Sequence, residues 1–144
     1  SILPDAGIGV DVIVGFPGES DDNFQQTCDF LDTMDVSYLH VFPYSERDET
    51  EAVNILPKVK FEKIMERSQV LHSISRQKKN TFNAQNIGNL REVLIESYKE
   101  GILSGLTENY IRVITEGKSN EVNSIIPLQM RDILQDKIIG HRII

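Results

Sequence analysis

The sequence predicts an α/β segment followed by a small all-β barrel. Its first 42 residues show a strand–helix–strand pattern, and a long helical pattern starts near Val59. After Gly88 the pattern changes to short β-branched segments divided by glycines, which is typical of small barrels or sandwiches. We therefore expect two domains, residues 1–87 and residues 88–144.

The first domain is predicted to begin with a βαβ unit. Residues 8–14 are apolar at nearly every position, which favours a strand that is buried on both faces. Ser20 is a good N-cap for the following helix, and Asp21 and Asp22 fall in its first turn, where the helix dipole favours acids. The apolar residues of this helix form one stripe, made of Phe24, Cys28, Leu31 and Met34. Residues 36–42 then form a second strand, which is parallel to the first in a βαβ unit.

A long connection and a long helix follow. Residues 43–57 lack periodicity, and loops of this length are usually functional or disordered. The helix that starts near Val59 has one apolar face, made of Phe61, Ile64, Leu71, Ile74 and Phe82. Its first charged residues are interpreted as a solvated face, made of Glu62, Lys63, Glu66 and Arg67. Three basic residues are interpreted as its electrostatically favoured C-terminal end, namely Arg76, Lys78 and Lys79, and Gly88 is the stop signal.

The second domain is predicted to be a small antiparallel barrel or sandwich. We expect strands at residues 91–98, 110–115, 124–128 and 138–144, with breaks at Gly101, Gly105 and Gly117. Basic and aromatic residues lie on or near these strands and turns: Tyr98, Lys99, Tyr110, Arg112, Lys118, Arg131, Lys137 and Arg142. Small barrels hold RNA backbones and stack bases with such side chains, although scattered solubilising residues are the simpler alternative.

Charge and composition limit the possible functions. The formal net charge is −7, of which −6 falls on residues 1–87 (14 acids, 8 bases) and −1 on residues 88–144 (8 acids, 7 bases). Any RNA contact must therefore come from local clusters, because proteins that bind nucleic acid through bulk charge are basic. No window approaches the ~18 apolar residues of a membrane span, and no signal peptide is present, so we expect a cytoplasmic protein without a membrane partner. The single cysteine, Cys28, is interpreted as a small core residue and leaves no internal disulfide or cysteine-based cluster.

Two segments are predicted to meet at the carboxyl edge of the parallel strands, where α/β folds bind ligands. The first is Gly-Phe-Pro-Gly at residues 15–18, where the two glycines would let a ligand approach the backbone; a tight turn is the equal alternative. The second, residues 40–47, begins with His40, a packed residue more often than a catalytic one. It ends in a polar cluster, Tyr44, Ser45, Glu46 and Arg47, which could equally be an ordinary surface loop.

Three motifs resemble the radical S-adenosylmethionine methylthiotransferases. They are GVDVIVGFPGE at residues 9–19, SYLHVFPYSER at residues 37–47 and GLTENYIRV at residues 105–113. The second and third look most like the branch that acts on threonylcarbamoyladenosine in tRNA. The branches that act on isopentenyladenosine in tRNA, or on a ribosomal protein, are close rivals.

The resemblance implies a three-part enzyme with two [4Fe–4S] clusters, S-adenosylmethionine and tRNA as substrate. Residues 1–87 would be the end of the radical (β/α) barrel, and residues 88–144 an OB-like TRAM barrel that binds RNA. The chain starts at Ser1 and lacks the family's CxxxCxxC motif, so we expect a C-terminal fragment whose partner is the missing N-terminal part. No metal ligand or catalytic residue can be carried over, and the fragment alone is expected to be inactive with no cofactor bound.

Some binding residues can be carried over from the resemblance. Those placed near S-adenosylmethionine are Val14, Gly15, Phe16, Pro17, Gly18, Val41, Phe42, Pro43 and Tyr44. Arg47 matches an arginine that could bind phosphate or cofactor. The family's Arg-Pro-Gly-Thr is here Arg47-Asp48-Glu49-Thr50, which leaves the conformation of this loop open.

The function implied is the addition of a methylthio group to C2 of N6-threonylcarbamoyladenosine next to the tRNA anticodon. The alternatives are the other two branches, a non-catalytic RNA-binding module, and an unrelated α/β enzyme with an appended barrel. Because strands taken from a barrel expose an edge, the first ~45 residues are expected to pair with a second copy of the chain or to be poorly ordered.

Overall fold

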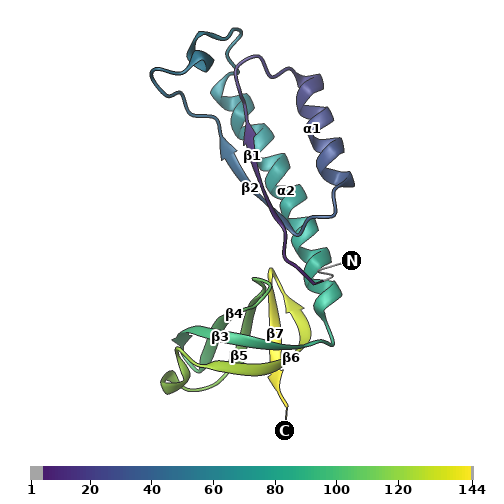
Figure 1. The fold of residues 1–144 in the computed structure, drawn as a ribbon, viewed down its shortest axis with the longest axis vertical. Helices are drawn as coiled ribbons and strands as arrows, with labels where there is room; N and C mark the ends of the chain where they lie inside the picture. The colour runs from purple at the N-terminus through teal and green to yellow at the C-terminus, as the bar shows by residue number, and fades with distance from the viewer. Residues whose placement is uncertain (1–4, 144) are drawn as a thin grey trace. The chain divides into compact units, whose positions relative to one another are not determined.

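The computed structural model describes residues 5–143, which fall into two compact units. One consists of residues 8–78, and the other of residues 5–7 together with residues 79–143. Figure 1 shows the order of the elements along the chain.

In the unit of residues 8–78, two parallel strands are joined by a helix, as predicted. Strand β1 (Gly9–Val14) leads into helix α1 (Asp21–Thr33) and then strand β2 (Tyr38–Pro43) (Figure 1). The register pairs Gly9 with Tyr38 and Val14 with Pro43. A short 3₁₀ helix, η1 (Glu51–Asn54), interrupts the long connection that follows.

The two strands are buried on one face only, so the prediction of burial on both faces of residues 8–14 is wrong. Val12 and Val14 are buried against the helices, whereas Ile13 is 59% exposed. The core lies on the helix side, and its buried members are Val12, Val14, Cys28, Leu31, Leu39, Ile64 and Leu71. An unbroken apolar run does not reveal whether a second layer covers the other face, and among the described residues none does.

Helix α1 has the cap and the apolar stripe that its sequence predicts. The Ser20 hydroxyl accepts a hydrogen bond from the Asn23 backbone N–H at 3.0 Å, and the Asn23 side chain accepts one from the Ser20 N–H, which makes a capping box. Cys28 and Leu31 are buried, and Phe24 and Met34 pack against the same core. Burial raises the pKa of the Cys28 thiol, as expected for a core cysteine.

Helix α2 (Phe61–Asn86) differs from its prediction in three respects. Phe61 is 70% exposed, although it lies only three residues before the buried Ile64; it is the first residue of the helix. Arg67 is buried and does not belong to a solvated face. The helix also continues past Lys79 to Asn86, so its last turn contains no basic residue. Gly88, at φ +88°, does follow the end of the helix.

Five strands of the second unit form a closed barrel in the order β3-β4-β5-β7-β6. Their bounds are Leu90–Lys99 (β3), Ile102–Thr107 (β4), Arg112–Glu116 (β5), Ile125–Leu134 (β6) and Lys137–Arg142 (β7), with a 3₁₀ turn, η2 (Ser119–Glu121), after β5. The pairs are antiparallel except for β5 and β7, which are parallel. The prediction of a small barrel is confirmed, and its size is compatible with an OB-like barrel. Ile144, at the end of the last predicted strand, lies outside the described residues.

Strand β4 was not predicted, because Gly105 was assigned to a break between strands. Gly105 instead lies inside the strand, opposite Ile95 and Val113. A Cβ at this position would overlap the carbonyl oxygen of Leu94 and would lie 2.8 Å from a Val93 methyl group. The glycine therefore permits a close approach of β3 and β4, and this use of glycine in a strand resembles a turn signal in sequence.

Candidate functional site

The two predicted rim segments meet in the structure, as their positions after parallel strands required. Val14 and Pro43 are paired in register, and the Tyr44 N–H donates to the Val14 carbonyl oxygen at 2.8 Å. The rings of Phe16 and Tyr44 make an edge-to-face contact with centroids 5.3 Å apart. Residues 15–18 and residues 42–44 therefore share one edge of the strand pair.

The residues of this rim differ in what they expose. Val14 is buried, so a ligand could not reach its side chain from outside, whereas Val41 is half-buried and packs against the core of the unit. Gly15 and Pro17 are also buried. The exposed members are Phe16, Gly18, Phe42 and Pro43. Of the nine predicted cofactor-binding residues, these four offer open surface and Tyr44 is half-buried.

The two glycines of the rim have different structural reasons. Both have left-handed backbone conformations, with φ of +81° at Gly15 and +83° at Gly18. A Cβ at Gly15 would overlap the side chain of Ile64, so packing on α2 requires glycine here. A Cβ at Gly18 would lie no closer than 3.6 Å to its nearest neighbour, Ile55 Cγ2, which leaves room at the surface. The tight-turn alternative therefore accounts for Gly15, and Gly18 remains the candidate for ligand approach.

An ion-pair cluster centred on the buried Arg67 was missed by the sequence prediction. Arg67 NH1 lies 2.5 Å from a Glu19 carboxylate oxygen, and Arg67 NH2 lies 2.8 Å from Asp21 Oδ1. The hydrogen bond from Arg67 holds the pKa of Asp21 below its ordinary value. A signal was present in the sequence, because Arg67 is three residues after Ile64 and four before Leu71, on the face that the apolar pattern marks as buried.

The loop after the rim carries the remaining predicted residues. Arg47 is exposed, and its carbonyl oxygen accepts a hydrogen bond from the Thr50 hydroxyl at 2.9 Å. Glu49 adopts φ +71°, at the position where the family pattern has glycine. His40 is exposed rather than packed in the core, and its ring lies between the rings of Tyr38 and Phe42 on the outer face of β2.

On the barrel, the motif at residues 105–113 forms a buried polar network. The Thr107 hydroxyl donates to Asn109 Oδ1 at 2.6 Å and accepts from the Ile111 N–H at 2.9 Å. Asn109 Nδ2 donates to the Asp5 carbonyl oxygen at 2.9 Å and to Asn86 Oδ1 at 3.2 Å. This network fixes the β4–β5 turn to the segment before β1 and to the end of α2.

Tyr110 follows this network and has a different character. Its φ is +65°, a left-handed conformation that is rare for an aromatic residue, and its side chain is 71% exposed. The residues on either side of Tyr110, Asn109 and Ile111, are both buried, and they anchor the turn that exposes the Tyr110 ring. Strained backbone of this kind is concentrated at binding sites.

The predicted RNA-binding cations differ in whether they are in ion pairs. Arg112 is paired with Glu96, and Arg142 with Glu121 at 2.7 Å. Lys99, Arg131 and Lys137 have no ion pair among residues 5–143.

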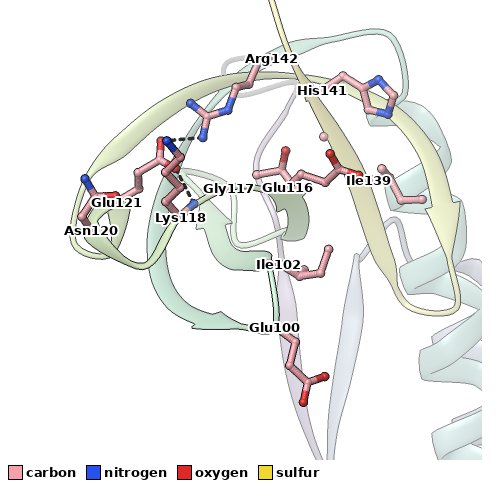
Figure 2. Close-up of a pocket in the computed structure, with 13 residues that line it drawn as sticks. Glu100, Ile102, Glu116, Gly117, Lys118, Asn120, Glu121, Ile139, His141 and Arg142 are labelled. Carbon is pink, nitrogen blue, oxygen red and sulfur yellow. Dashed lines mark hydrogen bonds and ion pairs between the residues drawn. The ribbon is translucent and has the colours of Figure 1, made fainter.

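Figure 2 shows a pocket of the barrel in which Lys118 and Arg142 stand beside Glu121. Strands β5 and β7 pair only over Val113–Ile114 and Ile138–Ile139. The pocket is lined by the residues that follow this pairing on each strand. Glu100, Glu116 and Glu121 line it together with the two cations and His141. The acids offset the cations, so the pocket is not a strongly positive surface.

The part of the chain that the structure describes contains no group of three side chains arranged to hold a metal ion. Within the same residues, no helix is long and apolar enough to cross a membrane.

The chain is similar to curated methylthiotransferases of three kinds, although no family model matches it. It is 42% identical over 115 residues to threonylcarbamoyladenosine tRNA methylthiotransferase MtaB of Aquifex aeolicus, which covers 79% of the chain and 27% of the relative. It is 30% identical over 138 residues to tRNA-2-methylthio-N(6)-dimethylallyladenosine synthase of Endomicrobium trichonymphae, covering 96% of the chain and 33% of the relative. It is 32% identical over 135 residues to ribosomal protein uS12 methylthiotransferase RimO of Clostridioides difficile, covering 94% of the chain and 29% of the relative.

The chain thus spans about a third or less of the length of these relatives. The similarity nevertheless extends over most of the chain and includes both rim segments and the barrel. These identities show that the chain belongs to the radical S-adenosylmethionine methylthiotransferase family.

Proposed function

We propose that this chain is the distal part of a tRNA methylthiotransferase that modifies C2 of N6-threonylcarbamoyladenosine next to the anticodon. The observation that carries this proposal is the 42% identity to an MtaB relative over 79% of the chain. A relative of the dimethylallyladenosine branch is 37% identical over 107 residues, so this branch is the main alternative and is included in the test below. Residues 1–87 would complete the catalytic barrel, and residues 88–144 would be the RNA-binding TRAM barrel.

The rim of β1 and β2 is the proposed contact with S-adenosylmethionine. The exposed rings of Phe16 and Phe42 offer apolar faces for an adenine, and Gly18 leaves open space beside them. The Tyr44 hydroxyl is buried and has no hydrogen-bond partner among the described residues, so this edge lacks one polar partner. These features fit a nucleoside. The cofactor, when bound beside a [4Fe–4S] cluster, supplies the radical chemistry, and the residues of this chain bind and orient it.

The barrel is the proposed contact with the anticodon stem-loop of tRNA. Tyr110 would stack on an unpaired base, and Lys99, Arg131 and Lys137 would contact phosphates. Arg112, Lys118 and Arg142 complete the proposed set, but two of these are already in ion pairs. Arg47 is proposed to contact phosphate from the loop after β2. The mixed charges of the barrel favour recognition of a loop shape over binding through bulk charge.

The test uses the full-length protein, with both clusters reconstituted, on three substrates. They are tRNA carrying threonylcarbamoyladenosine, tRNA carrying isopentenyladenosine, and the ribosomal protein uS12. Mass spectrometry of the digested products is expected to show the methylthio group on threonylcarbamoyladenosine alone. Product on one of the other two substrates would assign the protein to that branch and contradict the proposed substrate.

A further inference from the structure

Arg67 is a buried cation whose role is not explained by helix stability alone. Its side chain is only 4% exposed and contacts two carboxylates, and its NH1 also donates to the Glu19 carbonyl oxygen at 3.1 Å. The guanidinium lies 5.3 Å from the centroid of the Phe24 ring, which covers it from the α1 side. Burying a guanidinium costs free energy that ion pairs only partly offset. Such a residue is expected to hold something specific in place.

The group that Arg67 holds is connected directly to the candidate cofactor rim. One oxygen of Glu19 contacts Arg67, and the other accepts a hydrogen bond from the Gly15 N–H at 3.1 Å. The Glu19 N–H donates to the Phe16 carbonyl oxygen at 2.9 Å and closes the turn. The guanidinium therefore acts on the backbone of residues 15–18 through a single carboxylate.

The same face of α2 also sets the position of this loop by packing. Ile64 lies three residues before Arg67 and fills the space where a Gly15 side chain would stand. At the other end of the loop, the Gly18 N–H donates to the Pro57 carbonyl oxygen at 2.9 Å. Residues 15–18 are thus held by α2 at one end and by the residue 57 backbone at the other. This leaves the Phe16 ring and the Gly18 backbone exposed in one fixed arrangement.

We propose that Arg67 is a positioning residue of the cofactor site. Through Glu19 it sets the conformation of residues 15–18, and thereby the affinity of the rim for S-adenosylmethionine. This inference rests on the proposed function. Asp21 contributes mainly to the ion pair, because its side chain is 76% exposed and its carboxylate contacts are with Arg67 and Lys63. Glu19 is the member that transmits the effect.

The test compares conservative variants of the full-length protein that carries this chain. Glu19→Gln retains an acceptor for the Gly15 N–H but loses the negative charge. Arg67→Lys retains the positive charge but loses the planar guanidinium, which can donate to two groups at once. Lys63→Gln is the matched control, because Lys63 lies on the same helix and pairs with Asp21 and Glu66 at the surface. Two quantities are measured: the Kd for S-adenosylmethionine by equilibrium dialysis, and hydrogen exchange of residues 15–18 without the cofactor.

Both variants are expected to raise the Kd about tenfold or more, which is the effect of losing one charge-assisted hydrogen bond. Exchange at the Gly15 amide should accelerate by a similar factor. The Kd of the double variant for S-adenosylmethionine should be no higher than that of the single variant with the higher Kd, because the two residues act as one unit. Lys63→Gln should change neither quantity by more than about twofold, as expected for a surface pair.

The possible failures can be distinguished. If Glu19→Gln and Arg67→Lys lower the melting temperature but leave the Kd of the folded protein and the Gly15 exchange unchanged, Arg67 is structural only and the inference is overturned. If the wild-type protein takes up no S-adenosylmethionine, the proposed function itself fails and the inference fails with it. The wild-type measurement therefore tests the site, and the variants test the positioning role.

Discussion

At the scale of single residues, glycine shows how one residue type serves different physical needs in this chain. Gly105 has no positive φ and is required for the close approach of β3 and β4. Gly88 has a φ of +88° and open space around it. A side chain at position 105 is therefore excluded because there is no space for it. A side chain at position 88 is only disfavoured by the left-handed backbone conformation.

We expect Gly105→Ala to destabilise the barrel by about 3 kcal/mol or more, because the added Cβ would overlap backbone that cannot move without breaking the β3–β4 pairing. Gly88→Ala is the control and should cost about 1–2 kcal/mol through its left-handed conformation alone. Urea unfolding of the two variants measures the difference. Equal losses would show that β3 can shift away from β4 at low cost.

Tyr110 is the residue of the barrel whose geometry most favours a binding role. Its exposed ring is presented by a turn with an unfavourable backbone conformation, which the buried Thr107 and Asn109 maintain. Stacking of one base is worth about 1–3 kcal/mol, so Tyr110→Ala should weaken tRNA binding by about 5- to 150-fold. Tyr110→Phe should retain most of the affinity, because stacking needs only the ring. A large loss in the phenylalanine variant would instead assign the role to the hydroxyl.

At the scale of secondary-structure elements, the parts with local signals were predictable. The N-cap at Ser20 and the stripe of α1 depend on residues three or four positions apart, and both predictions are confirmed. The meeting of the two rim segments followed from the parallel arrangement of β1 and β2. Arg67 was misjudged because its charge was given more weight than its position on the helix, and its carboxylate partners lie 46 and 48 residues away. The buried network of Asn109 depends on Asp5, 104 residues distant, and no local pattern encodes it.

The β1–β2 pair has an apolar face that the described residues leave open. Ile13 and Phe42 are each at least half exposed on this face. We expect the 144-residue chain alone to self-associate through it, since burying such surface is favourable. Light scattering should show a mass that rises with concentration, and Ile13→Ser with Phe42→Ser should abolish the rise. Phe30→Ser, at an exposed site on α1, is the control, and an equal effect there would indicate non-specific aggregation.

The connection between β5 and β6 depends on an ionised carboxylate. Glu121 accepts a hydrogen bond from the Lys118 N–H at 2.8 Å and contacts Arg142 at 2.7 Å (Figure 2). The Lys118 N–H and then the Arg142 guanidinium lower the pKa of Glu121 below its ordinary value of 4.5. A lowered folded-state pKa stabilises the fold above the unfolded-state value, and this stability is lost as the pH falls through the folded value.

The melting temperature of the wild-type chain should therefore fall more steeply below pH 4.5 than that of Glu121→Gln. The two curves should differ most at neutral pH and converge in acid. Differential scanning calorimetry between pH 3 and pH 7 (roughly the range in which carboxylates titrate) measures the divergence. Parallel curves would mean that the ionised carboxylate adds no stability to this connection.

At the scale of the whole chain, the net charge of −7 constrains how this part of the protein would contact the proposed tRNA substrate. The long-range field is repulsive for a polyanion, so affinity must come from stacking and from a few cations in direct contact with phosphate. Lys99 and Arg131 are exposed and have no ion pair among residues 5–143, whereas Arg112 is already neutralised by Glu96. An unpaired cation can release a counterion from RNA, and a paired one must first give up its carboxylate.

The salt dependence of tRNA binding by the full-length protein distinguishes these two classes of cation. Lys99→Gln and Arg131→Gln should each make the slope of log K against log salt shallower by about 0.7–0.9, the amount expected for one lost phosphate contact. Arg112→Gln should leave the slope nearly unchanged. Fluorescence anisotropy with a labelled anticodon stem-loop at several salt concentrations measures all three. If Arg112→Gln changed the slope as much as the other two, the Glu96 pair would open on binding. If none changed it, the phosphate contacts would lie on other residues.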